Sequence, residues 1–316
     1  MKPGLVSPRL LFLGPDKYAG PWGAAFAELA PQIAFEVYRP GQDLSGYPYC
    51  LTWKPPHGLW PQMKDLRVVF SLAAGVDRLL NDPSFPRDVP LVRMVEPELT
   101  RGMVEYVQWQ CLFHHRRIWE LEAAQSCGEW RPHTYPAPWD RSIGIMGLGE
   151  LGAAAAAKLV EFGFKVRGWS RSPKSLPGVQ CFAGRDRLPE FLSGTEILVC
   201  LLPLTPETTG ILNASLFAQL PKGASLINAA RGGHLVEADL VPAMQSGRIA
   251  AATLDVFATE PLPPEHPFWD AERVYITPHN ASDTSPRSAA WRIAAQIARH
   301  EAGEQLEDVV DRARGY

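Results

Sequence analysis

Short apolar runs alternate with helical or polar segments through the first hundred residues. The runs include RLLFLG, IAFEVY, YCLTW, LRVVFSLAA and VPLVRMV, and the helix-like GAAFAELA lies between the first two. Apolar runs of this length, separated by helical or loop segments, are typical of strands in an α/β layer. This part of the chain therefore predicts a parallel sheet covered by helices.

A second series of strands is predicted after a loop at residues 130–141 that is rich in proline and tryptophan. Its members are SIGIMG, FKVRGW, VQCF, EILVCLLP, ASLINAA, AATLDVF and VYITPH. Near-continuous apolar runs such as ILVCLL indicate strands buried on both faces, as in a parallel sheet between two helical layers. The predicted fold class is α/β, with two doubly wound parallel-sheet domains.

Two predicted helices set the expected domain boundaries. Residues 102–119 have apolar side chains at spacings of three and four, which predicts one helix linking the domains. A closing helix at about 288–302 is expected to return to the first domain. The sequence therefore predicts a discontinuous domain, 1–101 with 282–316, around a continuous domain, 102–281.

Composition and charge exclude several classes of protein. The net charge is −3 with both signs interspersed, so we expect no nucleic-acid partner. The five cysteines form no CxxC pair, which indicates reduced, buried thiols in a cytoplasmic protein, and we expect no metal site. No apolar stretch approaches the roughly 20 residues of a membrane span, and the N-terminal RLLFLG is too short for a signal peptide.

GLGELG, at residues 147–152, carries the strongest local signal. Alone, its spacing is more often that of tight-turn glycines, but it follows an apolar strand, opens a helical run and lies within a βαβ unit of about 30 residues. In that setting Gly147 permits the turn, Gly149 lets the backbone approach a pyrophosphate, and Gly152 lets helix and strand pack closely. The larger domain is therefore predicted to be a Rossmann-type dinucleotide-binding domain, with Leu148, Glu150 and Leu151 also in the phosphate loop.

The end of the next strand indicates which dinucleotide is preferred. An acidic residue there would bind a free ribose 2′-hydroxyl, whereas this chain has Ser170, Arg171 and Ser172, with Lys174 close behind. Hydroxyls and a guanidinium suit a 2′-phosphate. We therefore expect NADPH as the cofactor, with NADH less favoured.

Three polar side chains follow later strands: Arg231 in NAARGG, Glu260 in LDVFATEPLP and His279 in ITPHNA. Ligands of open α/β sheets bind beyond the carboxyl ends of the strands, so these side chains could meet. Together they suit reduction of a 2-oxo acid. Arg231 would bind the substrate carboxylate and carbonyl, His279 would protonate the alkoxide, and Glu260 would fix the tautomer of His279 and favour its protonated form.

The ordered motifs GLGELG, LLPLTPET, INAARGG, LDVFATEPLP and TPH resemble the D-isomer-specific 2-hydroxyacid dehydrogenase family over nearly the whole chain. LTWKPP, CLLPLTPETTGILN and DRARGY further resemble its glyoxylate/hydroxypyruvate reductase A branch. The resemblance implies that Arg231, Glu260 and His279 form the catalytic set. It also implies a homodimer, in which the helix at 102–119 and the aromatic segment after it embrace the second subunit.

Further positions follow from the resemblance. The backbone of Gly75 and Val76 would bind the substrate carboxylate, and Trp53 would line the substrate side. Asp255 would contact the nicotinamide amide. Asn280 follows the histidine where many relatives have an aliphatic residue. The remaining cofactor-lining positions are Leu202, Pro203, Thr208 and Ala229.

Two other functions are compatible with parts of the sequence. One is a nicotinamide-sensing binding protein of the same fold, although a sensor would not need the complete Arg, Glu and His set. The other is a dehydrogenase of a larger 2-hydroxy acid. For the reductase, both glyoxylate and hydroxypyruvate are expected as substrates.

Overall fold

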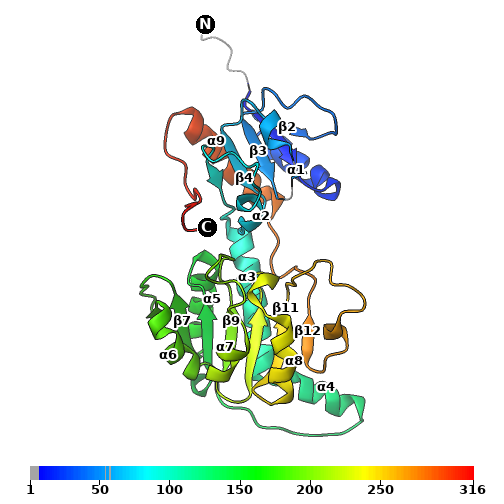
Figure 1. The fold of residues 1–316 in the computed structure, drawn as a ribbon, viewed down its shortest axis with the longest axis vertical. Coiled ribbons are helices and arrows are strands. Elements are labelled where there is room, and N and C mark those ends of the chain that lie inside the picture. Colours follow the sequence, from blue (N-terminus) through cyan, green and yellow to red (C-terminus); the bar gives the residue numbers. More distant parts are fainter. Residues whose placement is uncertain (1–6, 54, 57) are drawn as a thin grey trace. The chain divides into compact units, whose positions relative to one another are not determined.

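The computed structural model describes residues 7–53, 55–56 and 58–316, and the chain divides into two compact units (Figure 1). One unit comprises the residues up to Leu99 together with Asp283–Tyr316, and the other comprises Thr100–Ser282. The boundaries predicted from the sequence follow residues 101 and 281. No described helix is long and apolar enough to cross a membrane.

The first unit contains a five-stranded parallel sheet in the order β2-β1-β3-β4-β5. Alternate residues of β1 lie in two different cores: Leu10 and Phe12 pack with α1 and α9, whereas Leu11 and Leu13 pack on the other face. The sheet is thus buried on both faces, and the predicted closing helix packs in this unit. The elements are β1 Arg9–Leu13, α1 Asp16–Leu29, β2 Ala34–Val37, β3 Tyr49–Thr52, β4 Val68–Ser71, α2 Asp77–Leu80, β5 Leu91–Val92 and α9 Pro286–Glu301.

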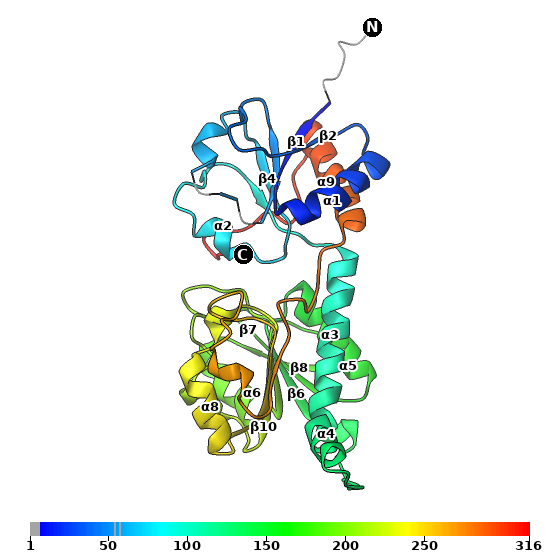
Figure 2. The same ribbon diagram turned by 90° about the vertical axis from the view of Figure 1, so that its right-hand side faces the viewer.

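The second unit contains a seven-stranded parallel sheet in the order β12-β11-β10-β9-β6-β7-β8. Its core alternates in the same way, since Ile197 and Val199 pack toward α3 (Pro97–His115) and α5 while Leu198 and Cys200 pack toward α6, α7 and α8 (Figure 2). Its strands are β6 Ser142–Met146, β7 Lys165–Ser170, β8 Val179–Ala183, β9 Ile197–Cys200, β10 Ala224–Asn228, β11 Ile249–Leu254 and β12 Val274–Ile276. Its other helices are α4 Ile118–Ser126, α5 Glu150–Glu161, α6 Leu188–Ser193, α7 Ala214–Gln219 and α8 Glu237–Gln245.

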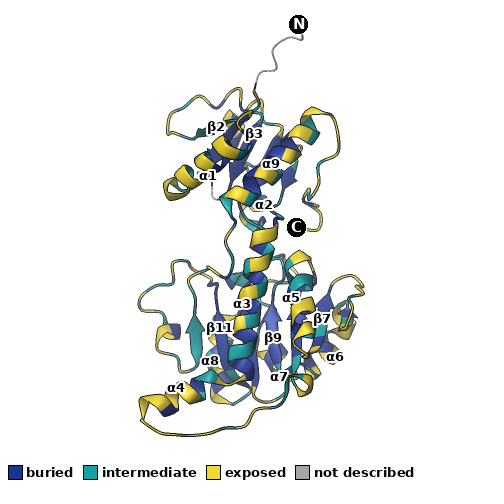
Figure 3. Ribbon diagram, turned by 180° about the vertical axis from the view of Figure 1, so that it is seen from behind, coloured by how far each residue is buried: buried dark blue, intermediate teal, exposed yellow. Residues whose placement is uncertain are grey.

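Helical layers on both faces of each parallel sheet confirm the predicted α/β fold class. Seen from behind, β9 and most of β11 are buried and β12 is half-buried, while the outer surfaces of α3 and α5 are exposed (Figure 3). The described residues also form five short 3-10 helices: η1 Trp60–Gln62, η2 Pro138–Asp140, η3 Arg185–Arg187, η4 Gly232–His234 and η5 Pro267–Trp269.

The single helix predicted at 102–119 is wrong in its limits. Helix α3 runs from Pro97 to His115, and α4 is a separate helix. The Glu96 carboxylate accepts hydrogen bonds from two backbone N–H groups of the first turn, which starts α3 earlier than the periodicity indicates. The left-handed φ of 49° at Arg117 then separates the two helices.

The expectation that the cysteines are buried thiols holds for three of the five. Cys50, Cys111 and Cys200 are buried in the sheets and α3, while Cys181 is half-buried and Cys127 is exposed. Cys127 is exposed because it caps the C-terminus of α4 rather than lying inside an apolar element. All five are free thiols.

Candidate active site

The glycine-rich loop joins β6 to α5 with a geometry that only small residues allow. Gly147 has a φ of 103°, and a Cβ on Gly152 would lie 1.8 Å from the carbonyl oxygen of Gly147. A Cβ on Gly149 would meet no atom within 4 Å, so the backbone there is open to a ligand. Because Gly149 is also the N-cap of α5, the loop fits the pyrophosphate of a dinucleotide.

The loop after β7 is the predicted site for the ribose phosphate. Arg171, Ser172 and Lys174 are exposed there. Ser170, by contrast, is buried, and its hydroxyl donates a hydrogen bond to the carbonyl of Ser172 at 2.8 Å. Ser170 therefore shapes the turn that presents the basic side chains.

The other predicted cofactor positions lie beyond the ends of β9 and β10. Leu202 and Ala229 are buried, and Pro203 is half-buried. The Thr208 hydroxyl donates to the carbonyl of Pro203 at 2.7 Å and so holds this loop closed on itself. These residues lie at the same edge of the sheet as the glycine-rich loop, because β9 pairs with both β6 and β10.

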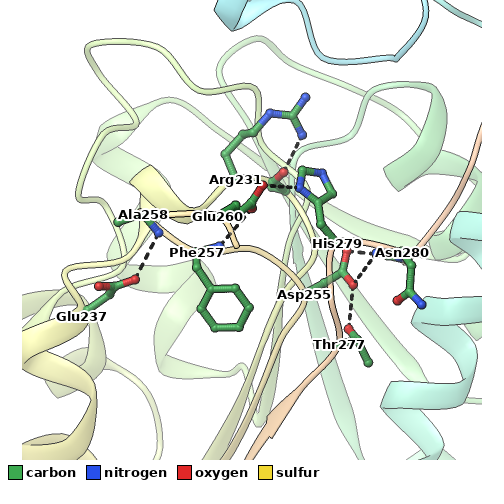
Figure 4. Close-up of polar contacts among 11 residues, drawn as sticks. Arg231, Glu237, Asp255, Phe257, Ala258, Glu260, Thr277, His279 and Asn280 are labelled. Atoms are coloured by element: carbon green, nitrogen blue, oxygen red, sulfur yellow. Dashed lines mark hydrogen bonds and ion pairs between the residues drawn. The ribbon is translucent and has the colours of Figure 1, made fainter. Parts of the chain in front are cut away.

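Arg231, Glu260 and His279 follow the adjacent strands β10, β11 and β12, and the structure brings the three side chains together. Figure 4 shows their polar groups pointing toward one another. Close approach of the first two loops requires a glycine next to the arginine, since a Cβ on Gly232 would lie 1.9 Å from the backbone of Phe257. The carboxyl edge of the sheet thus unites a guanidinium, a carboxylate and an imidazole.

The imidazole and the carboxylate form a defined pair. Nδ1 of His279 lies 2.8 Å from Oε2 of Glu260, with the two side chains 29% and 16% exposed. The second carboxylate oxygen accepts a hydrogen bond from the backbone N–H of Phe257 at 3.2 Å. Glu260 is thereby fixed on one side by the backbone while it orients the ring of His279.

Asp255 organises the loop that carries His279. Its carboxylate accepts hydrogen bonds from the hydroxyl of Thr277 at 2.6 Å and from the backbone N–H groups of Asn280 and Ala281. The N–H of His279 donates to the carbonyl of Asp255 at 2.8 Å, which supports the left-handed φ of 54° at His279. Burial raises the pKa of Asp255 above its ordinary value, against the lowering effect of these hydrogen bonds.

Three residues without a predicted role support this site. Thr277 joins Asp255 to the hydroxyl of Tyr106, which lies 2.7 Å from the Thr277 hydroxyl. His234 is fully buried, with Nδ1 3.0 Å from the carbonyl oxygen of Arg231 and Nε2 3.2 Å from that of Pro203. Polar side chains within two or three residues of Arg231 and His279 are the signal that could have indicated Thr277 and His234.

The positions predicted to bind the substrate carboxylate lie in the first unit, just beyond β4. Gly75 and Val76 immediately precede α2, and within the part of the chain that the structure describes neither backbone N–H donates a hydrogen bond. Trp53 is half-buried and packs against the core shared with α1 and α9. In the described residues no group of His, Cys, Asp and Glu side chains is arranged to hold a metal ion.

The chain is similar to known proteins over nearly its full length. The profile of the D-isomer specific 2-hydroxyacid dehydrogenase NAD-binding domain matches residues 109–281. The glyoxylate/hydroxypyruvate reductase A of Serratia proteamaculans is 46% identical over 97% of this chain and 99% of its own.

Two solved structures superpose closely on the fold. A D-isomer specific 2-hydroxyacid dehydrogenase from Xanthobacter autotrophicus, in complex with NADPH and MES, has a TM-score of 0.95 and 44% identity, and covers 98% of this chain and 100% of its own. An NADPH-dependent glyoxylate/hydroxypyruvate reductase from Sinorhizobium meliloti, with NADP and sulfate, has a TM-score of 0.93 and 44% identity, and covers 98% and 99%. The resemblance predicted from the motifs is confirmed, and the chain belongs to the D-isomer specific 2-hydroxyacid dehydrogenase family.

Proposed function

We propose that the protein is an NADPH-dependent reductase of small 2-oxo acids, which converts glyoxylate to glycolate and hydroxypyruvate to glycerate. The observation that carries the proposal is the Glu260–His279 pair next to Arg231 at the carboxyl edge of the larger sheet. The names of the relatives that match over the whole chain support the same substrates.

The proposed roles follow from the charges that the reaction creates. The reduced nicotinamide, when bound, supplies the hydride to the carbonyl carbon. Arg231 binds the substrate carboxylate through paired hydrogen bonds and stabilises the negative charge on the carbonyl oxygen. His279 donates the proton to that oxygen from Nε2, and Glu260 stabilises the imidazolium until the transfer. Gly75 and Val76 are proposed to donate backbone hydrogen bonds to a substrate carboxylate, and Trp53 to line the substrate side.

The residues of the larger unit fit the dinucleotide. The glycine-rich loop and the N-terminus of α5 would bind the pyrophosphate, Arg171 and Lys174 the 2′-phosphate, and Leu202, Pro203, Thr208, Ala229 and Asp255 the nicotinamide half. In this assignment residues 102–281 are the dinucleotide-binding domain, and the discontinuous unit is the substrate-binding domain. The complexes of the relatives with NADPH or NADP support the choice of cofactor.

Initial rates of cofactor oxidation test the proposal directly. Purified protein should oxidise NADPH with glyoxylate and with hydroxypyruvate, at a higher kcat/KM than NADH. Arg171→Gln removes a charge-assisted hydrogen bond of about 1.5–3 kcal/mol, so kcat/KM for NADPH should fall roughly 10- to 100-fold with little change for NADH. Equal efficiency of the wild type with both cofactors would contradict the NADPH assignment, and the absence of turnover would favour the sensor.

A homodimer is the proposed assembly. Aromatic side chains of α3 and of the segment after α4 are exposed in the single chain, including Trp109 at 54%, Trp130 at 96% and Trp139 at 65%. Exposed aromatic surface of this extent favours an interface with a second copy. Sedimentation at micromolar concentration should give twice the chain mass of 34.9 kDa, and a monomer mass would refute the proposal.

A further inference from the structure

The loop after β8 lies next to the loop that carries Arg171. β7 and β8 are parallel neighbours with Ser170 paired to Ala183, and the N–H of Gly184 donates to the carbonyl of Ser170 at 3.0 Å. The indole N–H of Trp169 donates to the carbonyl of Gly184 at 2.8 Å. These contacts fix the start of η3, and therefore Arg185, beside the basic turn after β7.

Arg185 differs from the arginines around it. Arg167 donates to the carbonyls of Glu190 and Phe191, and Arg187 donates to the Glu190 carboxylate at 2.7 Å. Both guanidiniums also lie over the ring of Phe182, at 4.6 and 5.4 Å from its centroid. Arg185 is exposed, and among the residues that the structure describes its guanidinium makes no hydrogen bond or ion pair. Arg185 thus lacks the structural hydrogen bonds that Arg167 and Arg187 make.

The charges of Arg185 and Arg171 both act on the carboxylate of Glu207. This exposed carboxylate lies in the loop after β9, on the far side of the glycine-rich loop from β7. After the hydrogen bonds from Thr205 and from its own backbone, the positive charges of Arg171 and Arg185 both lower the pKa of Glu207. Two cations from neighbouring loops therefore extend their fields over the same edge of the sheet.

We propose that Arg185 is a second residue that determines the preference for NADPH, and that it binds the 2′-phosphate together with Arg171. The inference rests on the proposed function, because it concerns the same ribose phosphate. A phosphate dianion has three acceptor oxygens, more than one guanidinium fork can satisfy, so a second fork from the adjacent loop completes its hydrogen bonding. A free 2′-hydroxyl carries no such charge, so Arg185 contributes nothing specific to NADH.

Binding measurements test the proposal without relying on turnover. NADP⁺ and NAD⁺ are titrated calorimetrically into the wild type, Arg185→Gln and the matched control Arg187→Gln, which removes a guanidinium two residues away that pairs with Glu190. Arg185→Gln should weaken NADP⁺ binding roughly tenfold and leave NAD⁺ binding unchanged, whereas Arg187→Gln should change neither. Arg185→Lys, which keeps the charge but not the fork, should recover part of the lost NADP⁺ affinity.

Other outcomes separate this inference from the proposed function. If the wild type prefers NADP⁺ and Arg171→Gln abolishes the preference, but Arg185→Gln binds NADP⁺ like Arg187→Gln, the role of Arg185 is overturned while the cofactor assignment stands. Equal weakening of NADP⁺ and NAD⁺ by Arg185→Gln also overturns it, because the phosphate would not be the group recognised. A wild type that binds both dinucleotides equally overturns the NADPH assignment, and the role of Arg185 with it.

Discussion

Nδ1 of His279 lies 2.8 Å from Oε2 of Glu260, and both residues lie in loops that follow neighbouring parallel strands. A carboxylate at this distance makes Nδ1 the donor nitrogen of the ring, which leaves proton exchange with a substrate to Nε2. The pair therefore has the arrangement of a general acid and the group that orients it.

Replacing Glu260 with Gln should lower the efficiency of catalysis at a fixed pH. Carbonyl reduction requires that Nε2 of His279 delivers a proton, and the Glu260 carboxylate fixes the ring for this transfer through Nδ1. Gln keeps a hydrogen-bond acceptor but removes the negative charge beside the ring, so kcat/KM for glyoxylate should fall. The measurement is kcat/KM in the wild type and in Glu260→Gln at the same pH.

Glu237→Gln is the matched control for this experiment. Glu237 accepts a hydrogen bond from the N–H of Ala258 at 3.1 Å, so it contacts the same loop as Glu260 without touching His279 (Figure 4). Its substitution should leave kcat/KM close to that of the wild type. Equal kcat/KM in the wild type and Glu260→Gln would mean that Glu260 does not assist His279, and the proposed pair would have to be abandoned.

His279→Gln should separate catalysis from cofactor binding. The glycine-rich loop and Arg171 are unchanged in this variant, so the Kd for NADPH should stay close to that of the wild type. Loss of a general acid should lower kcat roughly 10²- to 10⁴-fold. Arg231→Ala should also raise KM, because Arg231 is proposed to bind the substrate carboxylate. Loss of NADPH binding in His279→Gln would instead indicate a structural role for the histidine.

The fold and the meeting of Arg231, Glu260 and His279 could be predicted because they follow from strand order. Buried apolar runs mark parallel strands, and the carboxyl ends of parallel strands meet at one edge of the sheet. The residues after β10, β11 and β12 can therefore be predicted to meet without any knowledge of side-chain conformation. The glycine spacing could predict the phosphate loop for the same reason, because it depends on backbone geometry and not on side-chain conformation.

The supporting contacts could not be predicted because they depend on individual side-chain directions. Asp255 precedes Thr277 by 22 residues, and no periodicity indicates that its carboxylate turns toward the backbone of the His279 loop. The start of α3 is similar, because a Glu96 side-chain cap overrides the boundary that apolar spacing suggests. The sequence did not indicate the proposed role of Arg185. An exposed arginine has no distinguishing pattern until the pairing of β7 with β8 places it beside the loop that carries Arg171.

Thr277→Val should test how Asp255 holds the His279 loop. The variant keeps the side-chain shape but removes the hydrogen bond that the Thr277 hydroxyl donates to the buried carboxylate. A hydrogen bond to a charged group contributes about 1.5–3 kcal/mol, so unfolding in urea should show a loss of this size, with a lower kcat. Thr195→Val removes a buried hydroxyl at the opposite end of β9 and should leave kcat unchanged. Unchanged kcat in both variants would mean that the Thr277 hydroxyl does not help to position His279 for catalysis.

His114 should make the stability of the protein depend on pH near neutrality. Its Nε2 lies 2.9 Å from the hydroxyl of Thr253, and that hydroxyl donates its own proton to Gln110 at 2.9 Å. Nε2 must therefore be the protonated nitrogen of a neutral ring, and Nδ1 is buried with no hydrogen-bond partner in the described structure. Burial lowers the pKa of His114 from 6.5 to about 3, because an imidazolium there would leave a charged N–H unpaired.

The sign of this effect follows from proton binding. Between pH 6.5 and 3 the unfolded chain binds a proton at His114 that the folded chain does not, so the free energy of unfolding falls as pH decreases. Lowering the pH from 7.5 to 5.5 should reduce the free energy of unfolding by about 1.4 kcal/mol through this one group. His114→Gln keeps a donor toward Thr253 without a titrating ring, so urea unfolding of the variant should lose that much less stability over the same interval. An equal loss in both proteins would mean that His114 takes up its proton in the folded state.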